Sequence, residues 1–95
     1  MVIGILTLEL SIPAAHSLKE KRQVIKSVLA RLRREFNISI AEIDRHDNRQ
    51  IAVLGVACVS ADEKYAHGLL MRVVEWVENT RLDCTLTDFR IEMVH

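Results

Sequence analysis

The feature that most constrains the fold is a hydrophobic periodicity that changes along the chain from two residues to three or four and back again. Residues 2–12 alternate, and one parity is entirely apolar: Val2, Gly4, Leu6, Leu8, Leu10 and Ile12. This alternation is typical of a β-strand with one buried face. From Leu18 to Phe36 the apolar residues recur at threes and fours, which predicts a helix that packs on that face.

Polar residues with capping chemistry precede both helical segments. Ser17 is followed three positions later by Glu20, and Ser60 by Glu63. This spacing is that of a capping box, in which the serine oxygen accepts from the backbone amide of the acidic residue. We therefore expect one helix to begin at Leu18 and a second to begin after Ser60 and to end near residue 79.

The remaining segments supply three more strands. Residues 38–43 form a short β-like run, residues 44–50 a polar hairpin loop, and residues 51–59 a strand that is apolar on both parities and so belongs at the centre of a sheet. The last strand, residues 83–94, changes parity between Leu86 and Phe89, which predicts either a β-bulge or a strand that extends past the domain. Two interlocked right-handed βαβ units predict an α+β, ferredoxin-like βαββαβ sandwich, with a four-stranded antiparallel sheet and two helices on one face.

Length and composition favour one intracellular unit. The chain has 95 residues, little glycine or proline and no internal repeat, which predicts a single domain spanning residues 1–95. The first strand begins without a basic leader, and Cys58 and Cys84 lie in β-like runs without the spacing of a disulfide framework. We expect reduced thiols, a cytoplasmic location and no membrane partner.

The sheet face away from the helices is expected to be unusually apolar. It should carry Ile3, Ile5 and one face of the third strand, joined by Phe89, Ile91 and Met93 from the last strand. An exposed apolar face of this size usually marks an interface, so we predict a homodimer, or a partner packed sheet to sheet. The alternative is that a loop or the carboxy-terminal strand folds over it.

Charges are balanced in total, with thirteen basic and thirteen acidic residues, but they are unevenly placed. Residues 18–36 contain seven basic and two acidic residues, a local charge of +5, whereas residues 62–95 contain seven acidic and four basic, a local charge of −3. On a helical wheel Lys19, Arg22, Lys26 and Arg33 share one arc without a carboxylate, and the start of a helix also favours anions. The candidate nucleic-acid or anion-binding residues are Ser17, Lys19, Lys21, Arg22, Lys26 and Arg33. The alternative is an ordinary solvated helix face.

Motifs for catalysis or metal binding are weak. The sequence contains no glycine-rich phosphate loop and no nucleophile elbow, and both cysteines are better explained as core residues. His46 lies between Asp44 and Asp47, which could bind a divalent ion but is typical of a polar turn. We therefore predict no catalytic residue, metal or cofactor.

Four blocks of the sequence resemble the YlxP-like family of small bacterial proteins. They are residues 2–10, residues 17–22 (Ser-Leu-Lys-Glu-Lys-Arg), residues 36–42 and residues 53–60. The resemblance implies a ferredoxin-like fold. Through the neighbourhood of the family's genes with those of translation and ribosome-maturation factors, it also implies a connection to RNA or the ribosome. It implies no catalytic or binding residues.

Three hypotheses for the function follow. The first is a non-catalytic binding module that acts near RNA or the ribosome through the basic face of its first helix. The second is a homodimeric small-ligand-binding or regulatory domain, with its site in the dimer groove or at the start of that helix. The third is an enzyme that uses Cys58 or the His46 loop.

Overall fold

The periodicities of the sequence correspond to six regular elements. The structure is a computed structural model and describes every residue from Met1 to His95. In chain order the elements are β1 (Val2–Ser11), α1 (Leu18–Glu35), β2 (Ser39–Asp44), β3 (Ile51–Ser60), α2 (Glu63–Asn79) and β4 (Thr85–Val94). The predicted order of strands and helices is confirmed, and only the ends of the elements shift slightly.

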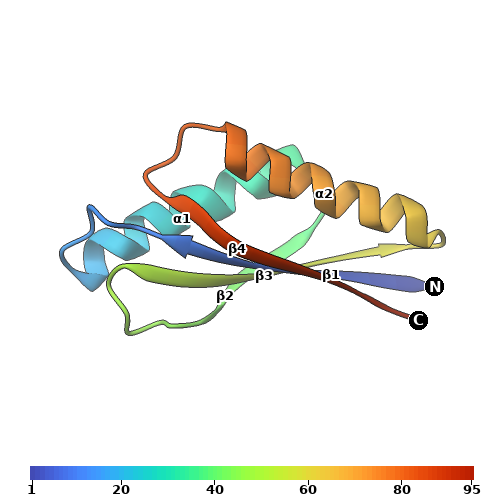
Figure 1. Ribbon diagram of the computed structural model, residues 1–95, viewed down its shortest axis with the longest axis horizontal. Coiled ribbons are helices and arrows are strands. Elements are labelled where there is room, and N and C mark those ends of the chain that lie inside the picture. Colours follow the sequence, from blue (N-terminus) through green and yellow to red (C-terminus); the bar gives the residue numbers. More distant parts are fainter.

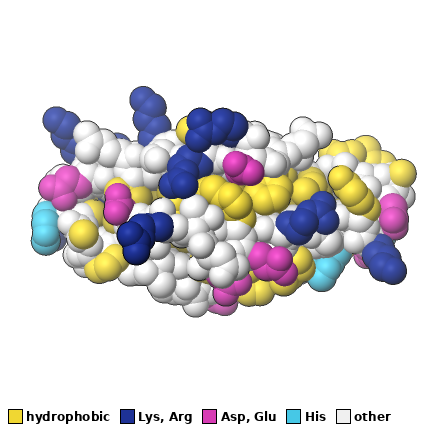
Figure 2. Space-filling model, turned by 90° about the horizontal axis from the view of Figure 1, so that it is seen from above, with side chains coloured by type: hydrophobic (Ala, Val, Ile, Leu, Met, Phe, Trp, Pro, Cys, Tyr) yellow, Lys and Arg dark blue, Asp and Glu magenta, His cyan; other side chains and the backbone are white.

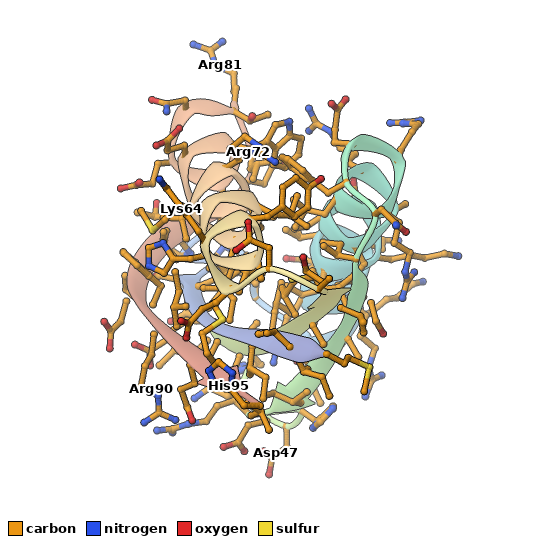
Figure 3. All side chains as sticks on the ribbon, turned by 90° about the vertical axis from the view of Figure 1, so that its right-hand side faces the viewer. Asp47, Lys64, Arg72, Arg81, Arg90 and His95 are labelled. Carbon is orange, nitrogen blue, oxygen red and sulfur yellow. The ribbon has the colours of Figure 1, made fainter.

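The four strands form one sheet in the order β2-β3-β1-β4, and each neighbouring pair is antiparallel. Both helices cover the same face of this sheet (Figure 1). The end view shows α2 on the β4 side and α1 on the β2 side, with the opposite face of the sheet left without a helix (Figure 3). This is the predicted ferredoxin-like sandwich.

The core lies between the sheet and the helices. On β1 the alternate residues Leu6, Leu8 and Leu10 are fully buried, and β3 contributes Leu54 opposite Leu8. The helices close this layer with their apolar stripes, which include Ile25, Val28 and Leu32 of α1 and Leu70, Val73 and Val74 of α2. Because burying one such side chain stabilises the fold by about 1.5–3 kcal/mol, the period-two and helical patterns together determine which faces meet.

The cap of α1 follows the sequence prediction. Ser17 Oγ accepts a hydrogen bond from the Glu20 amide at 3.1 Å, and Glu20 Oε2 accepts one from the amide of His16 at 2.8 Å. The carboxylate therefore reaches the residue before the cap, and two backbone donors at the helix start are satisfied by side chains.

The prediction that Ser60 caps α2 is wrong. Strand β3 runs through Ser60, and the cap is Asp62, whose carboxylate accepts from the Lys64 amide at 3.1 Å. Ser60 Oγ instead accepts from the Asp62 amide at 3.0 Å and so forms the turn before the helix. Both side chains are good caps, and pairing of Ser60 with β1 decides between them because it extends the strand.

Of the two alternatives for the last strand, a bulge or an extension past the domain, the bulge is confirmed. The register pairs Leu86 with Leu10 and Asp88 with Glu9, so Thr87 is the extra residue. Its hydroxyl donates to the Glu9 carbonyl oxygen at 3.1 Å. A bulge allows residues of different parity to point to the same face, and Leu86 and Phe89 both lie on the helix-facing side.

This register corrects part of the predicted interface. Phe89, Ile91 and Met93 pair with Leu8, Leu6 and Gly4 respectively. Directly paired residues of antiparallel strands point to the same face, so these three side chains lie on the helix side, and their placement on the open face was wrong. Ile3 and Ile5 do lie on the open face, as expected from their parity.

Candidate nucleic-acid interface

The strongest polar feature of the surface is a row of cations on α1. We use the name basic stripe for Lys19, Arg22, Lys26 and Arg33, all of which are exposed. At about 100° per residue the four fall within an arc of about 60°, and at ~1.5 Å per residue they span about 21 Å along the helix. In Figure 2, Lys and Arg side chains gather along the upper margin, which lies over α1.

No carboxylate neutralises the basic stripe. The ion pairs of the structure are Lys21 with Glu42, Arg90 with Glu92, and His95 with Glu63, and none involves a stripe residue. Arg33 Nη2 donates to the Ile40 carbonyl oxygen at 2.9 Å, which fixes this end of the stripe beside the edge strand β2. The excess positive charge predicted for this region is therefore exposed to solvent.

Lys21 does not belong to this surface, and its prediction as an anion-binding residue is wrong. Its side chain is 1% exposed, and its Nζ lies 3.0 Å from Glu42 Oε2 and donates to the Arg45 carbonyl oxygen at 2.6 Å. Glu42 Oε2 is buried and has no hydrogen-bond partner, so its contact with Lys21 is an ion pair and not an aligned hydrogen bond. The signal was present in the sequence, since Lys21 precedes Ile25 by four positions and Val28 by seven and so falls on the apolar stripe.

The start of α1 is also unsuited to an anion. Ser17 uses its hydroxyl to cap the helix, and the Glu20 carboxylate lies beside the same turn. A cavity of about 290 Å³ next to this turn is lined by both Glu20 and Asp83. Two carboxylates repel an anionic ligand, so the basic stripe, which runs from the first turn of the helix to its last, is the part of the predicted site that remains.

The cysteines lack the environment of a nucleophile. Burial raises the pKa of the Cys58 thiol, against the smaller opposite effect of a hydrogen bond with the Gly4 backbone. Burial and the nearby Asp83 carboxylate raise the pKa of Cys84. A raised pKa keeps a thiol protonated near neutral pH and therefore weakly nucleophilic.

The hairpin between β2 and β3 uses its polar groups to form the turn. His46 Nε2 lies 3.1 Å from the Glu42 carbonyl oxygen, and Asp44 Oδ1 accepts from the Arg45 amide at 2.7 Å. Arg45 adopts a positive φ of 61°, a conformation that non-glycine residues adopt mainly in such turns. No group of three or more His, Cys, Asp or Glu side chains gathers in the structure in a way that could hold a metal ion.

Neither helix combines the length and the apolar composition needed to cross a membrane.

Comparison with known proteins places these features in a family. A family model described as "Protein of unknown function (DUF503)" matches residues 3–91. The chain is also 38% identical over 78 residues to "Uncharacterized protein YlxP" of Bacillus subtilis (strain 168), which covers 82% of this chain and 85% of that protein. The resemblance to YlxP-like proteins is thereby confirmed, and the chain belongs to the DUF503 family of proteins of unknown function.

Proposed function

We propose that this protein is a non-catalytic binding module that contacts the phosphate backbone of structured RNA, such as ribosomal RNA, through the basic stripe of α1. The observation that carries the proposal is the exposure of four cations along about 21 Å of one helix face without a paired carboxylate. Lysine and arginine rows of this kind bind nucleic acid by neutralising phosphates and releasing counterions.

The surroundings of the stripe favour backbone contact over base stacking. Trp76 of α2 lies under Arg31, with the guanidinium 5.4 Å from the ring centroid, and Phe36 at the end of α1 is half-buried. Stacking of single-stranded bases requires exposed aromatic side chains, and the stripe offers none. A double-stranded or folded RNA, whose phosphates form a regular surface, fits this helix better than an unpaired strand.

The test is binding of purified ribosomal RNA and of a short RNA duplex, measured at several salt concentrations. If all four stripe residues contact phosphates, log K should fall against log salt with a slope of about −3, because each contact contributes about 0.7–0.9. Replacing Lys19, Arg22, Lys26 and Arg33 together by Gln should weaken binding at least about tenfold at low salt and remove most of that slope.

A matched control removes positive charge from residues outside the basic stripe. Lys64 and Arg72 of α2 and Arg81 of the following segment lie outside the basic stripe (Figure 3), and their replacement by Gln removes three positive charges from the same molecule. This control should retain the affinity and salt dependence of the parent protein. Equal losses of RNA affinity in the two variants would show that binding depends on net charge and not on the stripe. Unchanged binding by the stripe variant would also contradict the proposal.

A further inference from the structure

The sheet face without helices carries an apolar centre that no segment of residues 1–95 covers. Alternate residues of β1 and β3 point to this open face. Its apolar side chains from these two strands are Ile3, Ile5, Ile51, Val53, Ala57 and Val59. Val59 is 68% exposed, and at the same end of the face Val94 is 46% exposed. Ile43 of β2 is 53% exposed and lies over Gly55, where an added Cβ would come within 2.9 Å of its Cγ2.

Most of the charged residues of this face lie on its edge strands. The register places Asp88, Arg90 and Glu92 on β4 and Asp44 on β2, and it places Glu9 near the end of the inner strand β1. Arg90 extends below the sheet on the side opposite the helices (Figure 3), and it pairs with Glu92 at 3.0 Å. An apolar centre with a charged, solvated margin is the anatomy of a protein–protein interface.

The same charges argue against nucleic acid as the occupant of this face. Four carboxylates, of Asp44, Glu9, Asp88 and Glu92, stand against one guanidinium, that of Arg90. Phosphates would be repelled here, whereas the basic stripe lies along the flank of α1, in the helix layer. The two surfaces therefore suit partners of different chemistry.

We infer that the open face binds a second copy of this chain, sheet to sheet. Four strands at a spacing of about 4.8 Å, most of them ten residues long at ~3.3 Å per residue, give a face of about 600 Å². Two copies would bury about 1,200 Å² or more in total, which reaches the size of a specific interface. The small side chain of Ala57 leaves room for a second sheet beside it, whereas the space over Gly55 is filled by Ile43.

The test is the molar mass in solution by size-exclusion chromatography with light scattering, over a range of micromolar concentrations. The parent protein should elute at twice the chain mass of 10.9 kDa. Val59→Asp should shift the monomer–dimer equilibrium at least about a hundredfold toward monomer, because a two-fold axis introduces the buried charge twice. Val59 is exposed in the single chain, so the variant should keep its fold, and its melting temperature should match that of the parent protein at a concentration low enough to dissociate the dimer.

Tyr65→Lys is the matched control, since Tyr65 is a similarly exposed large apolar residue, 57% exposed, on the helix side. It should remain dimeric. Hydroxyl-radical footprinting of the parent protein adds a readout that does not depend on any variant, and Val59 and Ile43 should be protected at high concentration while Tyr65 is not. A monomeric parent protein, a dimer that survives Val59→Asp, or protection at Tyr65 instead of Val59 would overturn the inference.

Discussion

At the scale of single residues, the most consequential side chain is Lys21. It crosses from α1 to the β2–β3 hairpin and joins Glu42 and the Arg45 carbonyl oxygen at a site shielded from water. A buried charge is costly unless it is paired, so the lysine, the carboxylate and the left-handed backbone of Arg45 depend on one another. The role of Lys21 is therefore to hold the hairpin against the first helix.

Replacing Lys21 by Met should lower the free energy of unfolding by roughly 3–5 kcal/mol, because Glu42 and the Arg45 carbonyl oxygen lose their partner. The double variant Lys21→Met/Glu42→Leu should recover much of this loss, since it leaves no unpaired carboxylate. Urea denaturation measures both changes. Lys26→Met, at an exposed position of the same helix, should change stability by no more than about 0.5 kcal/mol. Equal effects of the two single lysine substitutions would refute the assigned role.

At the scale of elements, the close packing of α2 on the sheet depends on Gly4 in β1. A Cβ built at Gly4 would lie 3.0 Å from Leu70 Cδ1 and 3.0 Å from Cys58 Sγ, both closer than ordinary contact. Ala66 Cβ would lie 3.5 Å away. The absence of a side chain at this position therefore sets how near the helix can approach β1.

Gly4→Val should destabilise the protein by about 1–3 kcal/mol, because the added atoms push against Leu70 and force α2 outward. Adding Leu70→Ala should relieve part of this strain, and the double-mutant cycle should show a coupling of about 0.5 kcal/mol or more. Gly68→Ala is the matched control within α2. A Cβ there meets only Arg72 Nη1 at 3.9 Å, so this change should stabilise the helix by about 0.5–1 kcal/mol. Additive effects at Gly4 and Leu70 would contradict the proposed contact.

At the scale of the whole molecule, the two proposed surfaces are separate: the open face is the side of the sheet without helices, and the basic stripe lies along the flank of α1 beside β2. Pairing through the open face would leave both helix layers on the outside, so each dimer would present two basic stripes to solvent. Most of the acidic residues of the open face lie toward β4, at the sheet edge away from the basic stripe beside β2, which limits mutual neutralisation.

This arrangement predicts one RNA site per chain. With a short RNA duplex at saturation, light scattering should show two duplexes per dimer of the parent protein and one per chain of Val59→Asp. The slope of log K against log salt should be the same for the parent protein and for Val59→Asp, because both carry the same basic stripe. Retained binding by monomeric Val59→Asp would separate RNA contact from dimerisation, whereas loss of binding on dissociation would show that the site requires both copies.

The sequence alone determined the elements and their order, because the change between period-two and helical spacing is local. The cap at Ser17 and the bulge near Thr87 could also be located from neighbouring residues. The exposed arc of cations followed from helical geometry, since Lys19, Arg22, Lys26 and Arg33 lie on one side of a regular helix. These features depend on residues close together along the chain.

Only the tertiary structure decided which face of each strand meets which neighbour. The bulge at Thr87 turned Phe89, Ile91 and Met93 toward the helices, because an extra residue reverses parity and the pairing with β1 fixes its direction. Burial of Lys21 against Glu42 likewise joins residues that are distant in sequence. Long-range register and pairing arise from packing, which the local spacing of residues does not specify.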